Sequence, residues 1–227
     1  MKLKSIASLI LAALLACMMA APAFADMTLV TGAWEINQGA TSMEENAEAK
    51  AALEKALEGL LGAGYEAVAV LGRQVVAGTN YCILCKVTPV VPDAVSEWAL
   101  VYVYENLEGS AEITNVVSLL AAPEAGMTGA WAPNQGDEAL EADAKAALDA
   151  ALENMVGADY ETVAVLGSQV VAGMNYSLLC RVTPVTPDAV GSFAVVTVYR
   201  NLQGGAEITD VSDLDIANAA TAAAVEE

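Results

Sequence analysis

A tandem repeat constrains this chain more than any other feature of its sequence. Residues 74–81 read Gln-Val-Val-Ala-Gly-Thr-Asn-Tyr, and residues 169–176, 95 positions later, read Gln-Val-Val-Ala-Gly-Met-Asn-Tyr. Similarity at one long period indicates two copies of a folded unit, and 227 residues are enough for two domains of about 100 residues each. The predicted organisation is a signal peptide at 1–25, a first unit at 27–120, a linker at 121–126, a second unit at 127–216 and a flexible, acidic, Ala-rich tail at 217–227.

Each unit has one amphipathic helical segment followed only by strand-like segments. The apolar residues of these segments recur at helical spacing, and Gly62 and Gly157 mark where the segments end. Several strand-like runs with turn signals between them predict an antiparallel meander. We therefore expect the fold class α+β, with each unit formed by one helix that a four- to five-stranded antiparallel sheet wraps. The apolar helix positions are Ala49, Leu53, Leu57 and Leu60 in the first unit and Leu148, Leu152, Met155 and Val156 in the second.

The repeated Val-Ala-Gly sequence predicts a turn between two strands. Ala and Gly are depleted in strand interiors, and Gly tolerates positive φ, so we expect a hairpin with its tip at this point. Hairpin tips are usually polar because they face water. An apolar tip that occurs twice indicates a surface that inserts into a binding partner.

The composition excludes several classes of function. The chain has no histidine, which removes Ser-His-Asp and Cys-His catalytic machinery, the usual general base and His-bearing zinc sites. We therefore expect no catalytic residue, no metal and no cofactor, and an enzyme is the least favoured class. The formal net charge of −20 repels phosphate backbones and argues against nucleic-acid binding. The carboxylates are interpreted as a solvated surface.

Three cysteines follow the N-terminal segment, and their positions do not indicate a disulfide framework. Cys82 and Cys85 have C-x-x-C spacing, but residues i and i+3 of a strand point to opposite faces, which disfavours a redox or metal pair. Cys85 and Cys180 occupy the same position in the two repeats, so we expect them to be buried as small hydrophobic residues. Cys82 aligns with Ser177 and is expected on the outer face as a free thiol.

The N-terminal residues are typical of an export signal. Lys2 and Lys4 form a positive region, residues 6–20 form an apolar stretch that is short for a membrane span, and residues 23–25 read Ala-Phe-Ala, a cleavage signal. We expect a secreted bacterial protein, and loss of the two lysines takes its formal charge from −20 to −22. A second interpretation is a lipoprotein signal that leaves Cys17 lipidated. Without this lipid, no membrane contact of the mature chain is expected.

The repeated motif and its surroundings resemble the cystatins, most closely the stefin branch. In both units a glycine near the start is followed by the helix, the Gln-x-Val-x-Gly hairpin and a strand that ends in a second turn. The resemblance implies reversible, tight-binding, non-covalent inhibition of papain-like (cathepsin-type) cysteine peptidases, with up to two bound per chain. The glycine and the two turns would form a wedge that enters the active-site cleft. The implied peptidase-binding residues are Gly32, Gln74, Val75, Val76, Ala77, Gly78, Leu107, Glu108 and Gly109 in the first unit, and Gly129, Gln169, Val170, Val171, Ala172, Gly173, Leu202, Gln203 and Gly204 in the second.

Some features depart from the cystatin pattern. The second turns, 108–110 and 203–205, are Gly-rich and lack the Pro-Trp pair of secreted animal cystatins, so the first hairpin would carry more of the binding. Trp34 and Trp131 are expected to pack on the helix or the sheet, with contact to the target as the alternative. A different function on the same fold, a non-inhibitory extracellular adhesion or ligand-binding repeat, stays open.

Overall fold

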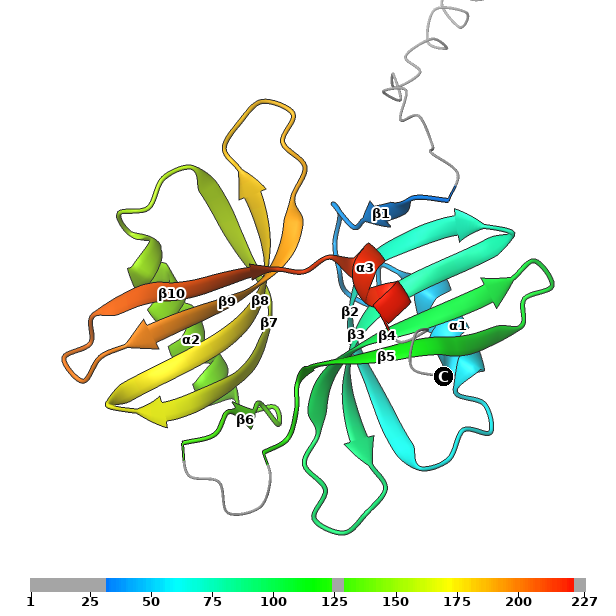
Figure 1. Cartoon of the computed structure of the whole chain (residues 1–227), viewed down its shortest axis with the longest axis horizontal. Helices are drawn as coiled ribbons and strands as arrows, with labels where there is room; N and C mark the ends of the chain where they lie inside the picture. Colours follow the sequence, from blue (N-terminus) through cyan, green and yellow to red (C-terminus); the bar gives the residue numbers. More distant parts are fainter. Residues whose placement is uncertain (1–31, 124–128, 223–227) are drawn as a thin grey trace, which may run out of the picture. The chain divides into compact units, whose positions relative to one another are not determined.

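Over the residues that the structure describes, the protein is mostly β, with 50% in strands and 16% in helices. The computed structural model describes residues 32–123 and 129–222. Two five-stranded antiparallel sheets and three short helices form this part of the chain (Figure 1). The expected α+β class, with one helix wrapped by a sheet in each unit, is therefore wrong. The predicted signal peptide, Cys17, part of the predicted linker and the end of the predicted tail lie outside the described residues.

The first sheet belongs to the first repeat and has the strand order β1-β2-β3-β4-β5. All neighbouring strands are antiparallel, and Gln74 pairs with Asn80 across the β2–β3 turn at Ala77, so the first predicted hairpin is confirmed. The elements are β1 Trp34–Ile36, α1 Ala47–Ala56, β2 Ala63–Val76, β3 Gly78–Pro89, β4 Glu97–Asn106 and β5 Ala111–Leu120.

The second sheet repeats this arrangement with the order β6-β7-β8-β9-β10. Gln169 pairs with Asn175 across a turn at Ala172, which confirms the second hairpin. One more helix, α3, follows β10. The elements are β6 Ala132–Pro133, α2 Glu138–Leu152, β7 Ala158–Val171, β8 Gly173–Pro184, β9 Ser192–Arg200, β10 Ala206–Asp213 and α3 Ile216–Ala222.

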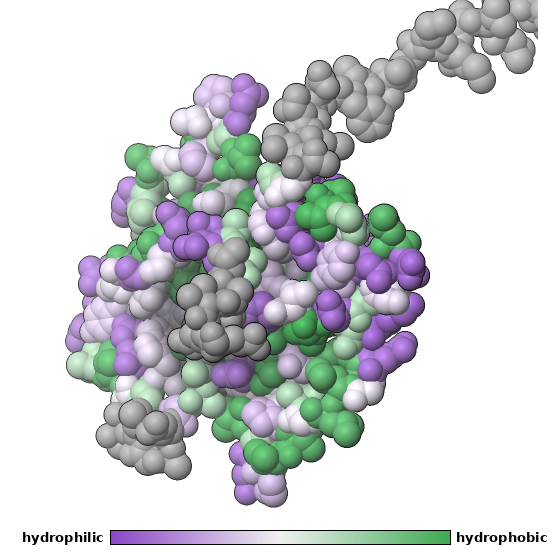
Figure 2. All heavy atoms as spheres, turned by 45° about the vertical axis from the view of Figure 1, so that its right-hand side comes forward, coloured by the Kyte–Doolittle hydropathy of each residue, from purple (hydrophilic) through white to green (hydrophobic). Residues whose placement is uncertain are grey.

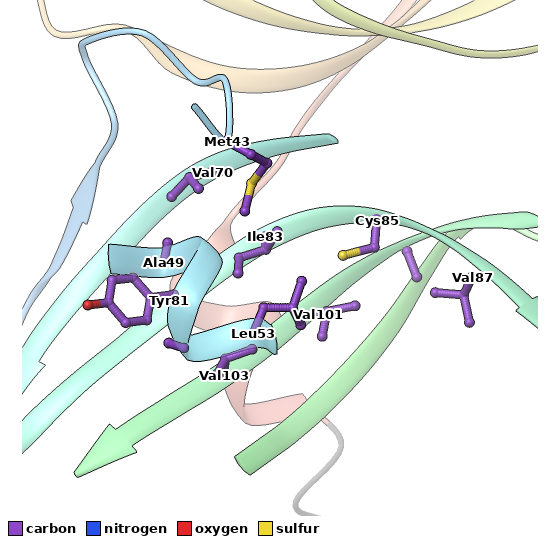
Figure 3. Packing of buried hydrophobic residues seen from close by; sticks show 12 residues of the cluster. Met43, Ala49, Leu53, Val70, Tyr81, Ile83, Cys85, Val87, Val101 and Val103 are labelled. Atoms are coloured by element: carbon purple, nitrogen blue, oxygen red, sulfur yellow. The ribbon is translucent and has the colours of Figure 1, made fainter. Parts of the chain in front are cut away.

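One face of each sheet packs against a helix. In the first repeat, α1 buries Ala49 and Leu53 against a face that carries Ile83, Val101 and Val103 (Figure 3). The α2 helix packs on the second sheet in the same way. Apolar side chains that recur every three or four residues therefore form the buried stripe of each helix, as their spacing predicted.

Both helices end earlier than the apolar spacing predicted. The α1 helix ends before Leu60, which is 46% exposed, and α2 ends before Met155 and Val156, which are 46% and 95% exposed. After each helix the chain reaches a glycine in the left-handed region, Gly59 at φ +79° and Gly157 at φ +110°. In the first repeat this glycine turns the chain away from the helix axis just before Leu60. In the second repeat Met155 and Val156 lie between the end of the helix and Gly157, outside the buried stripe.

The remaining faces of the two sheets pack against each other in one shared core. Leu71, Leu84 and Leu100 of the first sheet and Leu166 and Leu179 of the second are fully buried there. A sheet with a helix on one side commonly exposes polar residues on its other side. Here both faces of each sheet are apolar, because one packs on a helix and the other on the second sheet. The sheets therefore take part in every core of the protein, and the fold class is mostly β.

Two glutamines hydrogen-bond across the junction between the repeats. Gln38 Nε2 donates to Gly191 O at 2.9 Å, and Gly191 N donates to Gln38 Oε1 at 2.8 Å. Gln135 makes the same two bonds, both at 3.0 Å, with Ser96. Gln38 is equivalent to Gln135, and Ser96 is equivalent to Gly191, so each repeat gives and receives the same contact. The junction therefore has approximate twofold symmetry, as in a homodimer.

The cysteines lie on both faces of the strands. Cys85 and Cys180 are fully buried on the helix sides of their sheets, which confirms their expected role as small hydrophobic residues. Cys82 points to the opposite face, as its position predicted, but the second sheet covers that face and leaves the thiol 0% exposed. Burial raises the pKa of each of these three thiols to about 12. None of them is therefore a reactive thiolate at neutral pH.

The C-terminal segment differs from the flexible tail that the sequence predicted. Residues 217–222 continue α3, which begins at Ile216 and lies beside β4 and β5 in Figure 1. Asp215 Oδ1 accepts hydrogen bonds from two backbone N–H groups of the first turn, both at 3.0 Å. Tyr102 donates its O–H to Ile216 O at 2.8 Å, and Asn115 Nδ2 donates to Ala219 O at 3.0 Å. The Ala-rich segment is helical because the first repeat binds it.

The shared core predicts that the two repeats unfold together. Leu84→Ala in the first repeat should cost about 2–5 kcal/mol of unfolding free energy, because it leaves a cavity between the two sheets. Calorimetry of the full chain should show one transition for the parent and one, at a lower temperature, for the variant. Two transitions, of which the substitution moves only one, would show that the repeats are independent.

Candidate functional site

Three segments of the first repeat meet at one end of its sheet. The β2–β3 turn at Ala77 lies beside the β4–β5 turn, because Gly78 pairs with Asn106. On the other side of this hairpin, Gly32 N donates to Val75 O at 3.1 Å. We call Gly32 with residues 74–78 and 106–110 the first edge. The equivalent residues of the second repeat, Gly129 with 169–173 and 201–205, form the second edge. The structure therefore brings the predicted binding residues of each repeat together.

In each edge, a glutamine side chain of the hairpin hydrogen-bonds to the glycine segment. In the first edge, Gln74 Nε2 donates to Gly32 O at 2.7 Å, and Asn80 Nδ2 donates to Gln74 Oε1 at 2.7 Å. Both polar ends of this glutamine are thus satisfied inside the edge. The glutamine of the motif has a positioning role, because it orients Gly32 relative to the hairpin. We call Gly32, and its equivalent Gly129, the trunk glycine of each edge. The same bonds, both at 2.8 Å, join Gln169 to Gly129 and Asn175 to Gln169.

Each hairpin tip is held by a tyrosine from the neighbouring strand. Tyr104 donates its O–H to Ala77 O at 2.6 Å, and Tyr199 makes the same bond to Ala172 O. The next residue must be glycine, since a Cβ on Gly78 would overlap the carbonyl oxygen of the residue after Tyr104 and lie 2.9 Å from Tyr104 Cε2. Gly78 also has φ +129°, which other residues rarely adopt. The tip is therefore fixed in the free protein.

The second turns are ordered by an asparagine at their first position. Asn106 Oδ1 accepts hydrogen bonds at 3.0 Å from the backbone N–H groups of Glu108 and Ser110. Asn201 does the same for Gln203 and Gly205, at 2.9 and 3.0 Å. Such Asx turns satisfy the backbone inside the loop and leave the side chain at the second position free to project.

Large apolar side chains project from both edges. Leu107 and Leu202, at the tips of the second turns, are 84% and 78% exposed. The hairpins add valines that are 37% to 67% exposed. Apolar residues form separate patches between polar ones on the face drawn in Figure 2. Exposed apolar groups on a fixed scaffold are typical of a surface that binds a partner. The hairpin valines are Val75, Val76, Val170 and Val171.

The two edges carry different charges. Glu105 and Glu108 flank the tips of the first edge, whereas Arg200 and Gln203 occupy the equivalent positions of the second. Arg200 lies 3.6 Å from a carboxylate oxygen of Asp143 and is partly exposed. Charges at the rim of a binding surface change the association rate more than the affinity. The edges are thus alike in shape and different in electrostatic steering.

Sequence reasoning missed the residues that position the tips. Asn80 and Tyr104, with their equivalents Asn175 and Tyr199, hydrogen-bond to the motif glutamine and to the hairpin tip. Their identity at a spacing of 95 was the signal that could have found them. Trp34 packs edge-to-face on Tyr102, with ring centroids 5.6 Å apart, in agreement with the packing role preferred for it.

The described residues give no sign of a metal site or a membrane span. No group of three or more Cys, Asp or Glu side chains within residues 32–123 and 129–222 is placed to hold a metal ion. Over the same residues, no helix is long and apolar enough to cross a membrane.

Comparison with known proteins does not assign a family. No family model matches the sequence, and no curated protein matches it significantly. The relation to the cystatins therefore stays a prediction from the motif and its surroundings.

The close approach at Gly78 predicts a large difference between two glycine substitutions in the first edge. Gly78→Ala should cost about 3 kcal/mol of unfolding free energy, because its Cβ would overlap the β4 backbone. Gly109→Ala should cost about 1 kcal/mol, since Gly109 has φ +78° but open space around it. Denaturant unfolding of both variants measures the difference. Equal costs would contradict the tight packing of the tip.

Proposed function

We propose that this protein is a reversible, tight-binding, non-covalent inhibitor of papain-like cysteine peptidases and a divergent relative of the cystatins. Each edge would enter the active-site cleft of one peptidase molecule. The trunk glycine, the Gln-Val-Val-Ala-Gly tip and the second turn would contact the two walls of the cleft. The protein would act by occlusion and needs no catalytic residue, metal or cofactor of its own.

The observation that carries this proposal is the fixed apolar tip. Val75 and Val76 present hydrophobic surface next to Ala77, whose carbonyl is already bonded to Tyr104. A tip that is ordered before binding loses little conformational entropy in the complex. Its backbone is engaged in the sheet up to Val76 and again from Gly78, so it does not present an extended scissile bond to the catalytic thiolate. These properties suit an inhibitor better than a substrate.

The strand lengths support binding of two peptidases at once. Ser96, which contacts Gln135 of the other repeat, immediately precedes β4, and the second turn lies at the far end of that strand. Ten residues of strand span roughly 33 Å. In the second repeat, Gly191 contacts Gln38 and β9 leads away from it over nine residues, roughly 30 Å. Each edge thus lies far along its strands from the junction.

The proposed site of action is outside the producing cell. The N-terminal charge pattern, apolar stretch and Ala-Phe-Ala sequence support export and cleavage after Ala25. Lipidation at Cys17 is the alternative, and it would keep the same inhibitor at the cell envelope. The acidic surface favours solubility in either location.

Acidic substitutions in the tips test the proposal directly. Val75→Asp combined with Val170→Asp should weaken inhibition of papain about 30-fold or more at each edge, because a carboxylate would be desolvated in an apolar cleft. The measurement is the inhibition constant of the full mature chain for papain.

A matched control uses exposed valines at turns remote from the edges. Val90 and Val185 occupy equivalent positions after β3 and β8 and are 74% and 64% exposed. Val90→Asp with Val185→Asp adds the same charge and should leave inhibition unchanged. If the edge pair and the control pair of substitutions weakened inhibition equally, the effect would be one of general charge. If the parent chain did not inhibit papain at all, the edges would bind another extracellular ligand and the proposal would fail.

A further inference from the structure

The end of each repeat packs against the other repeat, next to the short strand that follows the trunk glycine. We call these short strands, β1 and β6, the trunk strands. A Cβ placed on Gly72 of β2 would lie 2.5 Å from Ile216 Cδ1, and one placed on Gly167 of β7 would lie 2.6 Å from Leu120 Cδ2. Ile216 follows the last strand of the second repeat, and Leu120 ends the last strand of the first. The two contacts are therefore crossed. A Cβ at either glycine would also overlap a backbone oxygen of its own repeat, Glu35 O at Gly72 and Ala132 O at Gly167, so glycine is needed on both counts.

These two glycines also pair with the trunk strands. Gly72 is the partner of Ile36 in β1, and Gly167 is the partner of Pro133 in β6. The strands have only three and two residues, and Pro133 cannot donate a backbone hydrogen bond. Such short edge strands have little stability of their own. An apolar side chain packed against the same glycine supports the strand from the other repeat.

A second contact connects α3 to the trunk of the first edge. The Tyr102 ring packs edge-to-face on Trp34 of β1, with an interplanar angle of 84°, and its O–H donates to Ile216 O at 2.8 Å. Ile216 is 1% exposed and Tyr102 is 2% exposed, so both are fixed in the shared core. Two residues before Trp34, the chain reaches Gly32, whose carbonyl accepts from Gln74. A continuous set of contacts thus runs from α3 to the trunk glycine.

We propose that each peptidase-binding edge is completed by the other repeat, with Ile216 positioning the first edge and Leu120 positioning the second. Both are positioning residues, since they act through the trunk strand and not by contact with the peptidase. The part of this inference that concerns inhibition rests on the proposed function. The part that concerns the trunk strands does not, because it describes the free protein.

The test substitutes each residue in full-length mature chains that have one working edge. Val170→Asp leaves the first edge as the reporter, and Val75→Asp leaves the second. Ile216→Ala and Leu120→Ala are introduced separately into each background, and Ile216→Val serves as the conservative variant that keeps the contact. The inhibition constant for papain is measured for every combination.

The expected pattern is crossed. Ile216→Ala should weaken the first edge about tenfold and leave the second unchanged, and Leu120→Ala should do the reverse. Ile216→Val should restore most of the binding at the first edge. Equal weakening of both edges by either alanine would indicate general loosening of the shared core and would overturn the proposal. So would an unchanged affinity of both edges.

Amide exchange separates this inference from the proposed function. Asn37 N donates to Leu71 O at 2.8 Å, and its equivalent Asn134 N donates to Leu166 O at 2.7 Å, so each amide reports on the end of one trunk strand. Ile216→Ala should speed exchange at Asn37 about tenfold more than at Asn134, because it loosens one strand locally. If papain were not inhibited by the parent chain, the proposed function would fail while this pattern still tested the crossed support. Equal protection at both amides in the variant would contradict it.

Discussion

The packing of one sheet against the other is the interaction on which the rest of this structure depends. Leu84 and Leu179 occupy equivalent positions in the two repeats and meet in one core that neither repeat can close alone. Removing apolar surface from water contributes about 25 cal/mol per Å² buried, so this large shared face stabilises both sheets at once. The glutamine contacts around it add direction, since Gln38 and Gln135 each bind one backbone position of the other repeat. The two repeats thus share one core, and each carries one candidate site.

That arrangement gives the edges two kinds of support. Within a repeat, Gln74 and Tyr104 fix the trunk and the tip through hydrogen bonds to backbone carbonyls. Between repeats, Ile216 at the start of α3 packs against Gly72, and Leu120 at the end of β5 packs against Gly167. Hydrogen bonds orient the edge, and the crossed packing lies against the strand that follows the trunk glycine. A rigid edge binds with little loss of conformational entropy, which is what occlusion of a narrow cleft requires.

Local features of the fold were predictable from the sequence, and features that depend on distant contacts were not. The turn at Ala77 follows from Val-Ala-Gly between two strand-like runs, and α1 follows from the spacing of Ala49 and Leu53. The α3 helix could not be predicted from its Ala-rich sequence, because its burial requires Tyr102 of the other repeat. The fold class was wrong for a related reason. Residues 82–85 form an unbroken apolar run, which is typical of a strand buried on both faces, whereas a single sheet wrapped around one helix buries only one face.

The candidate sites followed from the same repetition. The trunk glycines, the hairpin tips and the second turns are brought together as the motif order predicted, whereas Asn80 and Tyr104 were recognised only from their contacts.

The central claim is that both edges occlude papain-like peptidases. Titration of a known concentration of papain with the intact mature chain tests inhibition by both edges most directly. We predict complete inhibition at about half a mole of chain per mole of papain, as expected for two tight sites on each chain. Papain that stays fully active at a large excess of the chain would contradict the claim.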